Sequence, residues 1–154
     1  MNQVSLSPTQ LRHVVEDIAA RPGEWAGLVR YGTSERWYHR LLQDHDQEVW
    51  LLSWLPGQDT GFHDHGESAG AFAVAFGALC ERSLSKGARE PVGITMLQGT
   101  VRSFGPGHIH AVSNASQQLA VSIHAYSPPL TTMQRFELTA TGLVPVSVDT
   151  AEQW

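Results

Sequence analysis

The stretch FHDHGESAGAFAVAFG, residues 62–77, contains two catalytic patterns that belong to different folds. HDH places His63 and His65 two residues apart, and side chains at that spacing on a strand point to one face, where both rings can reach one metal ion. GESAG, residues 66–70, matches the G-x-S-x-G turn that carries the nucleophile of a serine hydrolase. What surrounds the two patterns decides between them.

The hydrolase pattern lacks the surroundings that it needs. A chain of 154 residues is long enough for one domain, whereas the hydrolase fold requires a large doubly wound sheet with a helix directly after the serine. Ser68 is instead followed by AFAVAF, which favours a strand. Glu81 and Glu90 precede a histidine, so the order of the triad residues does not exclude a hydrolase by itself. The short chain and the missing helix argue against a hydrolase, and we interpret GESAG as a turn.

Composition excludes several kinds of partner. The chain has 15 acidic and 10 basic residues, and Lys86 is its single lysine, so no basic cluster is available to follow a phosphate backbone. The longest apolar run, GAFAVAFGALC, is about half of a membrane span, and the N-terminus lacks a signal pattern. Cys80 is the only cysteine, which excludes an internal disulfide and fits a reducing compartment. We expect a cytoplasmic monomer that binds neither nucleic acid nor membrane, with Cys80 as a buried apolar filler.

The N-terminal part, residues 1–30, predicts a helical lead. In SPTQLRHVVEDIAARPG, Ser7 is a helix N-cap and Gln10 completes a capping box. An apolar stripe at helical spacing gives this helix one face to pack on the rest of the protein. A short second helix is expected over residues 24–29.

From about residue 36 to residue 140 the sequence predicts short strands separated by turn-forming residues, which is typical of a small barrel or sandwich. No internal repeat or linker indicates a second domain, so residues 1–154 are expected to form one mainly β domain. The predicted strands are RWYHRLLQ, EVWLLSWL, AFAVAFGALCERSL, GITMLQG, TVRSF, AVSN, LAVSIHAYS and MQRFELT.

The histidine pair needs at least a third ligand to hold a metal. The histidines downstream of the pair are the candidates, namely His108, His110 and His124. The remaining histidines, His13, His39 and His45, are interpreted as surface or loop residues.

Glycine spacing makes the chain resemble the cupin superfamily, whose fold is a small double-stranded β-helix. Gly57, the HDH pair and Gly77 match the first cupin motif, and Gly99, Gly107, His110 and Asn114 match the second. The resemblance implies that His63, His65 and His110 are the metal ligands. The glutamate that usually follows the histidine pair is missing, and Gly70 stands near its place. Three neutral imidazoles leave a divalent metal its full charge, which favours an anionic ligand such as a thiolate.

Within the cupins, four segments resemble the cysteine dioxygenase type I family. They are YHR at 38–40, HDHG at 63–66, GHIHAVSN at 107–114 and SIHAYSPP at 122–129. The resemblance implies an Fe(II) enzyme in which L-cysteine and O2 give cysteine sulfinic acid. It further implies that Arg40 holds the substrate carboxylate, with Tyr38 beside it, and that Ser122, His124 and Tyr126 form a hydrogen-bonded relay ending near the metal.

One departure from the family concerns a covalent link. Many members join a cysteine to the tyrosine of the relay through a thioether, but Gly70 occupies the cysteine's position here. The resemblance therefore implies an unmodified Tyr126.

Two other functions stay open at this stage. The first is a dioxygenase of 3-mercaptopropionate or another small thiol, although relatives of that kind tend to carry glutamine at the Arg40 position. The second is a non-catalytic cupin that senses a metal or small ligand. Nickel, manganese and zinc also accept three imidazoles, so the ligand set alone does not select iron.

Overall fold

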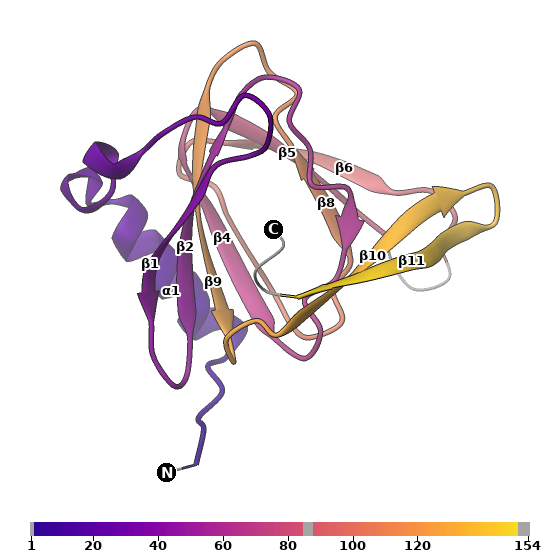
Figure 1. Ribbon diagram of the computed structural model, residues 1–154, viewed down its shortest axis with the longest axis horizontal. Coiled ribbons are helices and arrows are strands. Elements are labelled where there is room, and N and C mark those ends of the chain that lie inside the picture. Colours follow the sequence, from indigo (N-terminus) through magenta and orange to yellow (C-terminus); the bar gives the residue numbers. More distant parts are fainter. Residues whose placement is uncertain (1, 85–87, 151–154) are drawn as a thin grey trace.

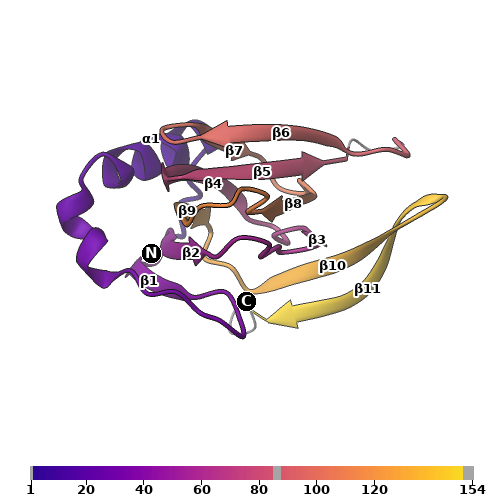
Figure 2. The same cartoon turned by 90° about the horizontal axis from the view of Figure 1, so that it is seen from above.

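Two β-sheets build most of the structure, a computed structural model that describes residues 2–84 and 88–150. The mainly β, cupin-like fold predicted from the sequence is confirmed, and Lys86 and Trp154 lie outside the described residues. Figure 1 shows the strands arranged as a ring with α1 on its outside. In Figure 2, α1 and the β10–β11 hairpin lie at opposite ends of the molecule. The helical elements are α1 (Pro8–Ala19), η1 (Pro22–Glu24) and η2 (Ala26–Leu28), and the strands are β1 (Tyr38–Gln43), β2 (Glu48–Trp54), β3 (Phe62–His63), β4 (Ala69–Phe76), β5 (Ala78–Ser83), β6 (Val92–Leu97), β7 (Val101–Phe104), β8 (His110–Ser113), β9 (Ala120–Ser127), β10 (Thr132–Thr139) and β11 (Gly142–Thr150).

The predicted N-terminal helix is confirmed together with its cap. The Ser7 hydroxyl accepts from the Gln10 backbone N–H at 3.2 Å, and the Gln10 side chain accepts from the Ser7 N–H at 2.8 Å. The second helix predicted over 24–29 is wrong: this glycine-containing stretch forms the two short 3₁₀ turns η1 and η2. Gly23 and Gly27 favour helix poorly, and a 3₁₀ turn needs only three or four residues.

The five-stranded sheet, in the order β1-β2-β9-β4-β7, separates two apolar clusters. On β4, the four alanines at 69, 71, 73 and 75 pack with α1, whereas Phe72 and Val74 face the barrel interior. On β9, Val121, Ile123 and Ala125 likewise pack toward the helix. Because a strand alternates its side chains, the residues between them face inward. The small alanines leave room for α1, with Leu11 and Val15 fully buried against them.

The six-stranded sheet, in the order β11-β10-β3-β8-β5-β6, carries the other side of the interior. In the pairing of β3 with β8, His63 lies directly opposite His110. β10 pairs with β3 on the other side, where Arg135 lies opposite His63. Strand β11 was not among the predicted strands, and it pairs along the length of β10. This sheet therefore brings two distant histidine motifs together.

No helix in residues 2–84 and 88–150 is long and apolar enough to cross a membrane.

Candidate metal centre

Three histidine rings from two motifs meet inside the barrel. The ring centroids of His63, His65 and His110 are 4.8 to 4.9 Å apart, and their ligand nitrogens all lie within 4.8 Å of one another. All three are at most 4% exposed. The sequence predicted that both residues of the HDH pair lie on a strand, but only His63 does. Gly66, with φ of +58°, begins a turn directly after His65, and the two rings converge nevertheless.

Hydrogen bonds at Nδ1 leave the Nε2 lone pairs of His63 and His110 available. The Nδ1–H of His63 donates to the carbonyl of Gly61 at 2.9 Å, and the Nδ1–H of His110 donates to Glu81 at 2.8 Å. A neutral imidazole that donates from Nδ1 keeps the Nε2 lone pair for a metal. Neither ring nitrogen of His65 has a hydrogen-bond partner in the described structure, although both are buried. Such an orphaned pair of nitrogens fits a missing ligand, so the three rings suit a divalent transition metal.

Burial keeps these rings neutral. It lowers the pKa of His63 and of His65 well below the usual value, and the neighbouring imidazoles lower it further. Burial also lowers the pKa of His110, although contact with Glu81 opposes this effect. Neutral imidazole is the form that binds metal.

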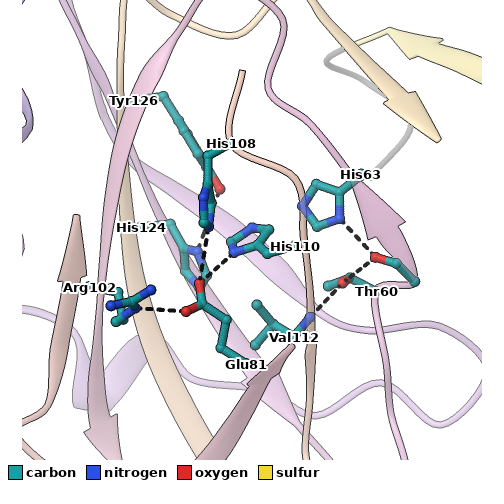
Figure 3. A network of polar contacts seen from close by, with 10 residues as sticks. Thr60, His63, Glu81, Arg102, His108, His110, Val112, His124 and Tyr126 are labelled. Carbon is teal, nitrogen blue, oxygen red and sulfur yellow. Dashed lines mark hydrogen bonds and ion pairs between the residues drawn. The ribbon is translucent and has the colours of Figure 1, made fainter. Parts of the chain in front are cut away.

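Glu81 is a fully buried carboxylate that sequence reasoning assigned no role (Figure 3). One oxygen accepts from Nε of Arg102 at 2.7 Å and the other accepts from Nδ1 of His110 at 2.8 Å. Burial raises the pKa of Glu81, but the contacts with His108, His110 and Arg102 outweigh it and leave that pKa well below its ordinary value. Its partners are 21 and 29 residues away in sequence, so no local pattern could have identified it.

His108, the main rival for the third ligand, lies outside the cluster of three. Its ring stacks on Phe104 with centroids 4.6 Å apart, and its Nε2 lies 3.5 Å from the Glu81 carboxylate. Glu81, His108 and His110 thus make a second set of ligand-type groups that shares His110 with the first.

The side chains predicted to form a relay are in contact. Trp54 donates its indole N–H to the Ser122 hydroxyl at 2.9 Å, and Ser122 lies 2.7 Å from Nε2 of His124. The Tyr126 hydroxyl is 3.5 Å from Nδ1 of His124. The Ser122 oxygen accepts from the indole N–H, and the His124 ring joins Ser122 to Tyr126 through its two nitrogens.

The relay ends against the histidine cluster. The Tyr126 ring stacks on His65 with centroids 5.1 Å apart. Burial raises the pKa of Tyr126 above its ordinary value, so the phenol stays protonated at neutral pH. Burial lowers the pKa of His124 to about 3, so this ring is neutral and keeps one donor and one acceptor nitrogen.

A narrow cavity joins the histidine cluster to the relay, and arginines line it. Arg36 and Arg135 face this cavity together with residues of the cluster and the relay. Arg135 is paired with Asp149 at 2.6 Å and also donates to the Thr60 carbonyl. Arg36 lies over the Trp54 ring, and within the described residues its guanidinium has no hydrogen-bond or ion-pair partner. The cavity lining is Arg36, Leu52, Thr60, His63, His110, Val112, His124, Tyr126, Met133 and Arg135.

Tyr38 and Arg40 lie in a neighbouring pocket. The Arg40 side chain is 47% exposed, its nearest carboxylate is Glu48 at 4.0 Å, and its guanidinium lies over Trp50. Tyr38 packs edge-on against the same Trp50 ring. The two residues line a pocket with Glu48 and Trp50, whereas other residues line the cavity of the histidine cluster. Tyr38 packs against the apolar cluster that includes Tyr126.

Gly70 stands directly opposite Tyr126 in the pairing of β4 with β9. A Cβ at this position would lie 2.6 Å from the Phe104 ring and 3.0 Å from the Tyr126 ring. Phe104 therefore fills the space that a crosslinking cysteine would need. Cys80, expected to be buried, is half-buried on β5.

Ser68 has a structural contact and no catalytic one. Its hydroxyl donates to the Pro128 carbonyl at 2.7 Å, and the strand β4 follows it instead of a helix. This agrees with the interpretation of GESAG as a turn.

A cupin barrel with a cluster of three inward histidines defines a metal-binding cupin, and comparison with known proteins names the family. The family model for cysteine dioxygenase type I matches residues 5–139. The chain belongs to this family. It is 26% identical over 146 residues to cysteine dioxygenase type 1 of Danio rerio, covering 86% of this chain and 71% of that protein. Against the Rattus norvegicus protein the identity is 28% over 141 residues, covering 83% and 68%.

Solved structures with the same fold are more distant in sequence. A protein of Thermus thermophilus superposes with a TM-score of 0.60 at 21% identity, covering 68% of this chain and 93% of its own. A double-stranded β-helix protein of Klebsiella pneumoniae gives 0.59 at 16% identity, covering 79% and 93%. A cupin superfamily protein of Desulfitobacterium hafniense gives 0.55 at 12% identity, covering 68% and 87%. These likenesses support the cupin fold.

The packing around Gly70 predicts that a cysteine there does not crosslink. Gly70→Cys is expected to destabilise the protein by about 1–3 kcal/mol, because the new side chain overlaps the Phe104 ring. Chemical denaturation measures this loss. Intact mass spectrometry after iron and cysteine treatment is expected to show no loss of two hydrogens. Efficient thioether formation in this variant would contradict the packing argument, and Gly23→Cys, where nothing lies within 4 Å, is the matched control.

Proposed function

We propose that this protein is an iron-dependent dioxygenase that converts L-cysteine and O2 into cysteine sulfinic acid. The thiol sulfur is oxidised, both atoms of O2 are transferred to it, and no further reductant is consumed. Fe(II), held by His63, His65 and His110, would supply the Lewis acidity and electron transfer that this reaction needs. A cytoplasmic location and a monomeric state belong to the same proposal.

The observation that carries this function is the position of His65. Its ring is buried with both nitrogens unpartnered, and it stacks on Tyr126, the end of the relay. A site that only stored a metal would need no buried chain of hydroxyl, imidazole and phenol beside it. The contact with His124 orients the Tyr126 phenol, which lines the cavity where a reacting group would lie.

Arg36 is the group best placed to bind the substrate carboxylate. A guanidinium keeps its charge in proteins, and a desolvated charge requires a partner. Burial and the nearby Arg135 lower the pKa of Arg36, against the opposing effect of Tyr126 and Asp59. A carboxylate in the cavity would supply a partner. Arg40, the sequence candidate for this role, has solvent and Glu48 instead.

The substrate assignment is tested by anaerobic loading with Fe(II) and exposure to O2 with single thiols. L-Cysteine is expected to give cysteine sulfinic acid with one O2 consumed per product, and to react faster than 3-mercaptopropionate, which lacks the amine. Oxygen electrode traces and product chromatography measure both. Sulfinate from 3-mercaptopropionate alone would replace the proposed substrate, and no O2 uptake with any small thiol would leave the sensor function.

The carboxylate site is tested by a pair of variants, Arg36→Met and Arg40→Met. Loss of a buried charge partner costs about 2–5 kcal/mol, so Arg36→Met is expected to lower kcat/KM for L-cysteine by roughly 30-fold or more. For cysteamine, which has no carboxylate, the same variant should change kcat/KM little. Arg40→Met is expected to leave the ratio between the two thiols unchanged. A selective loss of cysteine turnover in Arg40→Met, with Arg36→Met normal, would return the role to Arg40.

A further inference from the structure

We propose that Glu81 is a positioning residue that selects the metal-binding tautomer of His110. This role rests on the proposed metal function of the three histidines and on no particular thiol. Glu81 on β5 lies opposite Val112 on β8, two residues along that strand from His110. Its two carboxylate oxygens make different contacts. One oxygen accepts a hydrogen bond from Nε of Arg102 at 2.7 Å, and the other accepts one from Nδ1–H of His110 at 2.8 Å.

The bond to Glu81 determines which nitrogen of His110 carries the proton. A carboxylate can only accept, so a ring that faces it at 2.8 Å must present N–H from Nδ1. The proton then cannot sit on Nε2, and the Nε2 lone pair is free. Since both Glu81 and His110 are buried, no water competes for this arrangement. Partners of this kind orient metal-binding histidines and raise their basicity.

Arg102 makes the role specific to a carboxylate. A guanidinium donates and never accepts, so it occupies one oxygen of residue 81 permanently. A glutamine at 81 has a single oxygen, and Arg102 is expected to take it. The amide NH2 would then face Nδ1 of His110 and force that nitrogen to act as acceptor. The proton of His110 would move to Nε2 and block the metal.

The test uses the protein without iron or thiol and follows His110 by ¹H–¹⁵N NMR. In the metal-free wild type we expect His110 protonated at Nδ1, and after Zn(II) addition we expect one equivalent bound through Nε2. Glu81→Gln should show His110 protonated at Nε2. By chelator competition its Zn(II) affinity should fall by roughly 10–100-fold, the range seen when such partners are lost.

Two further variants separate positioning from a general loss of stability. Arg102→Met combined with Glu81→Gln frees the amide oxygen to turn toward His110, so the double variant should regain Nδ1 protonation and part of the Zn(II) affinity. Glu48→Gln is the matched control: Glu48 is also buried, at 1% exposed, and accepts from the Leu130 backbone N–H at 2.8 Å, away from the histidines. It should bind Zn(II) like the wild type.

Three results would overturn this role for Glu81. They are Zn(II) bound through Nδ1 of His110, two tightly bound equivalents with the second on Glu81 and His108, or an unchanged tautomer and affinity in Glu81→Gln. Zn(II) is redox-inert, so none of these measurements depends on O2 chemistry. Absence of thiol oxidation would refute the proposed reaction and leave this test intact.

Discussion

Desolvation of three imidazole rings is the constraint on which the rest of the structure depends. Buried rings stay neutral because the protein interior disfavours the imidazolium form. A neutral ring has one donor and one acceptor nitrogen, so the fold must satisfy the donor without using the acceptor. The Gly61 carbonyl does this for His63 and the Glu81 carboxylate does it for His110. His65 has no hydrogen bond among the described residues, and its ring stacks on Phe104 at 4.9 Å and on Tyr126 at 5.1 Å.

The alternation of β4 and β9 is what allows a polar site inside so small a barrel. Apolar residues of both strands form a second core with α1 on the outer face of the sheet. Because the outer core supplies apolar packing, the inner face of β9 can carry the polar residues Ser122, His124 and Tyr126. Burying polar groups without hydrogen bonds is costly, and these three are hydrogen-bonded to one another. On β4, Gly70 has no side chain, and this leaves room for the Phe104 ring next to the Tyr126 ring.

What could be predicted from the sequence was local. The capped helix, most strands and the HDH, GHIH and SIHAY segments each depend on residues a few positions apart, and the cupin spacing of glycines joins the halves. Arg36 was missed because the carboxylate-binding role was assigned to Arg40 from the YHR resemblance. Arg36 precedes β1, which begins at Tyr38, and its side chain lines the cavity. Glu81 was missed because its partners come from β7 and β8, and only strand pairing brings them together.

The charge of the cavity lining limits which thiols can enter. Among the described residues that line the cavity, two are arginines and none is a carboxylate, and burial keeps the histidines neutral. Arg135 is paired with Asp149 and Glu81 is paired with Arg102, so among the described residues around the cavity the unpaired charge is that of Arg36. A bound divalent metal would add positive charge, because none of the three ligand residues in the cluster is anionic. A molecule with two negative groups would therefore be attracted at both, with one group near the metal and the other near Arg36.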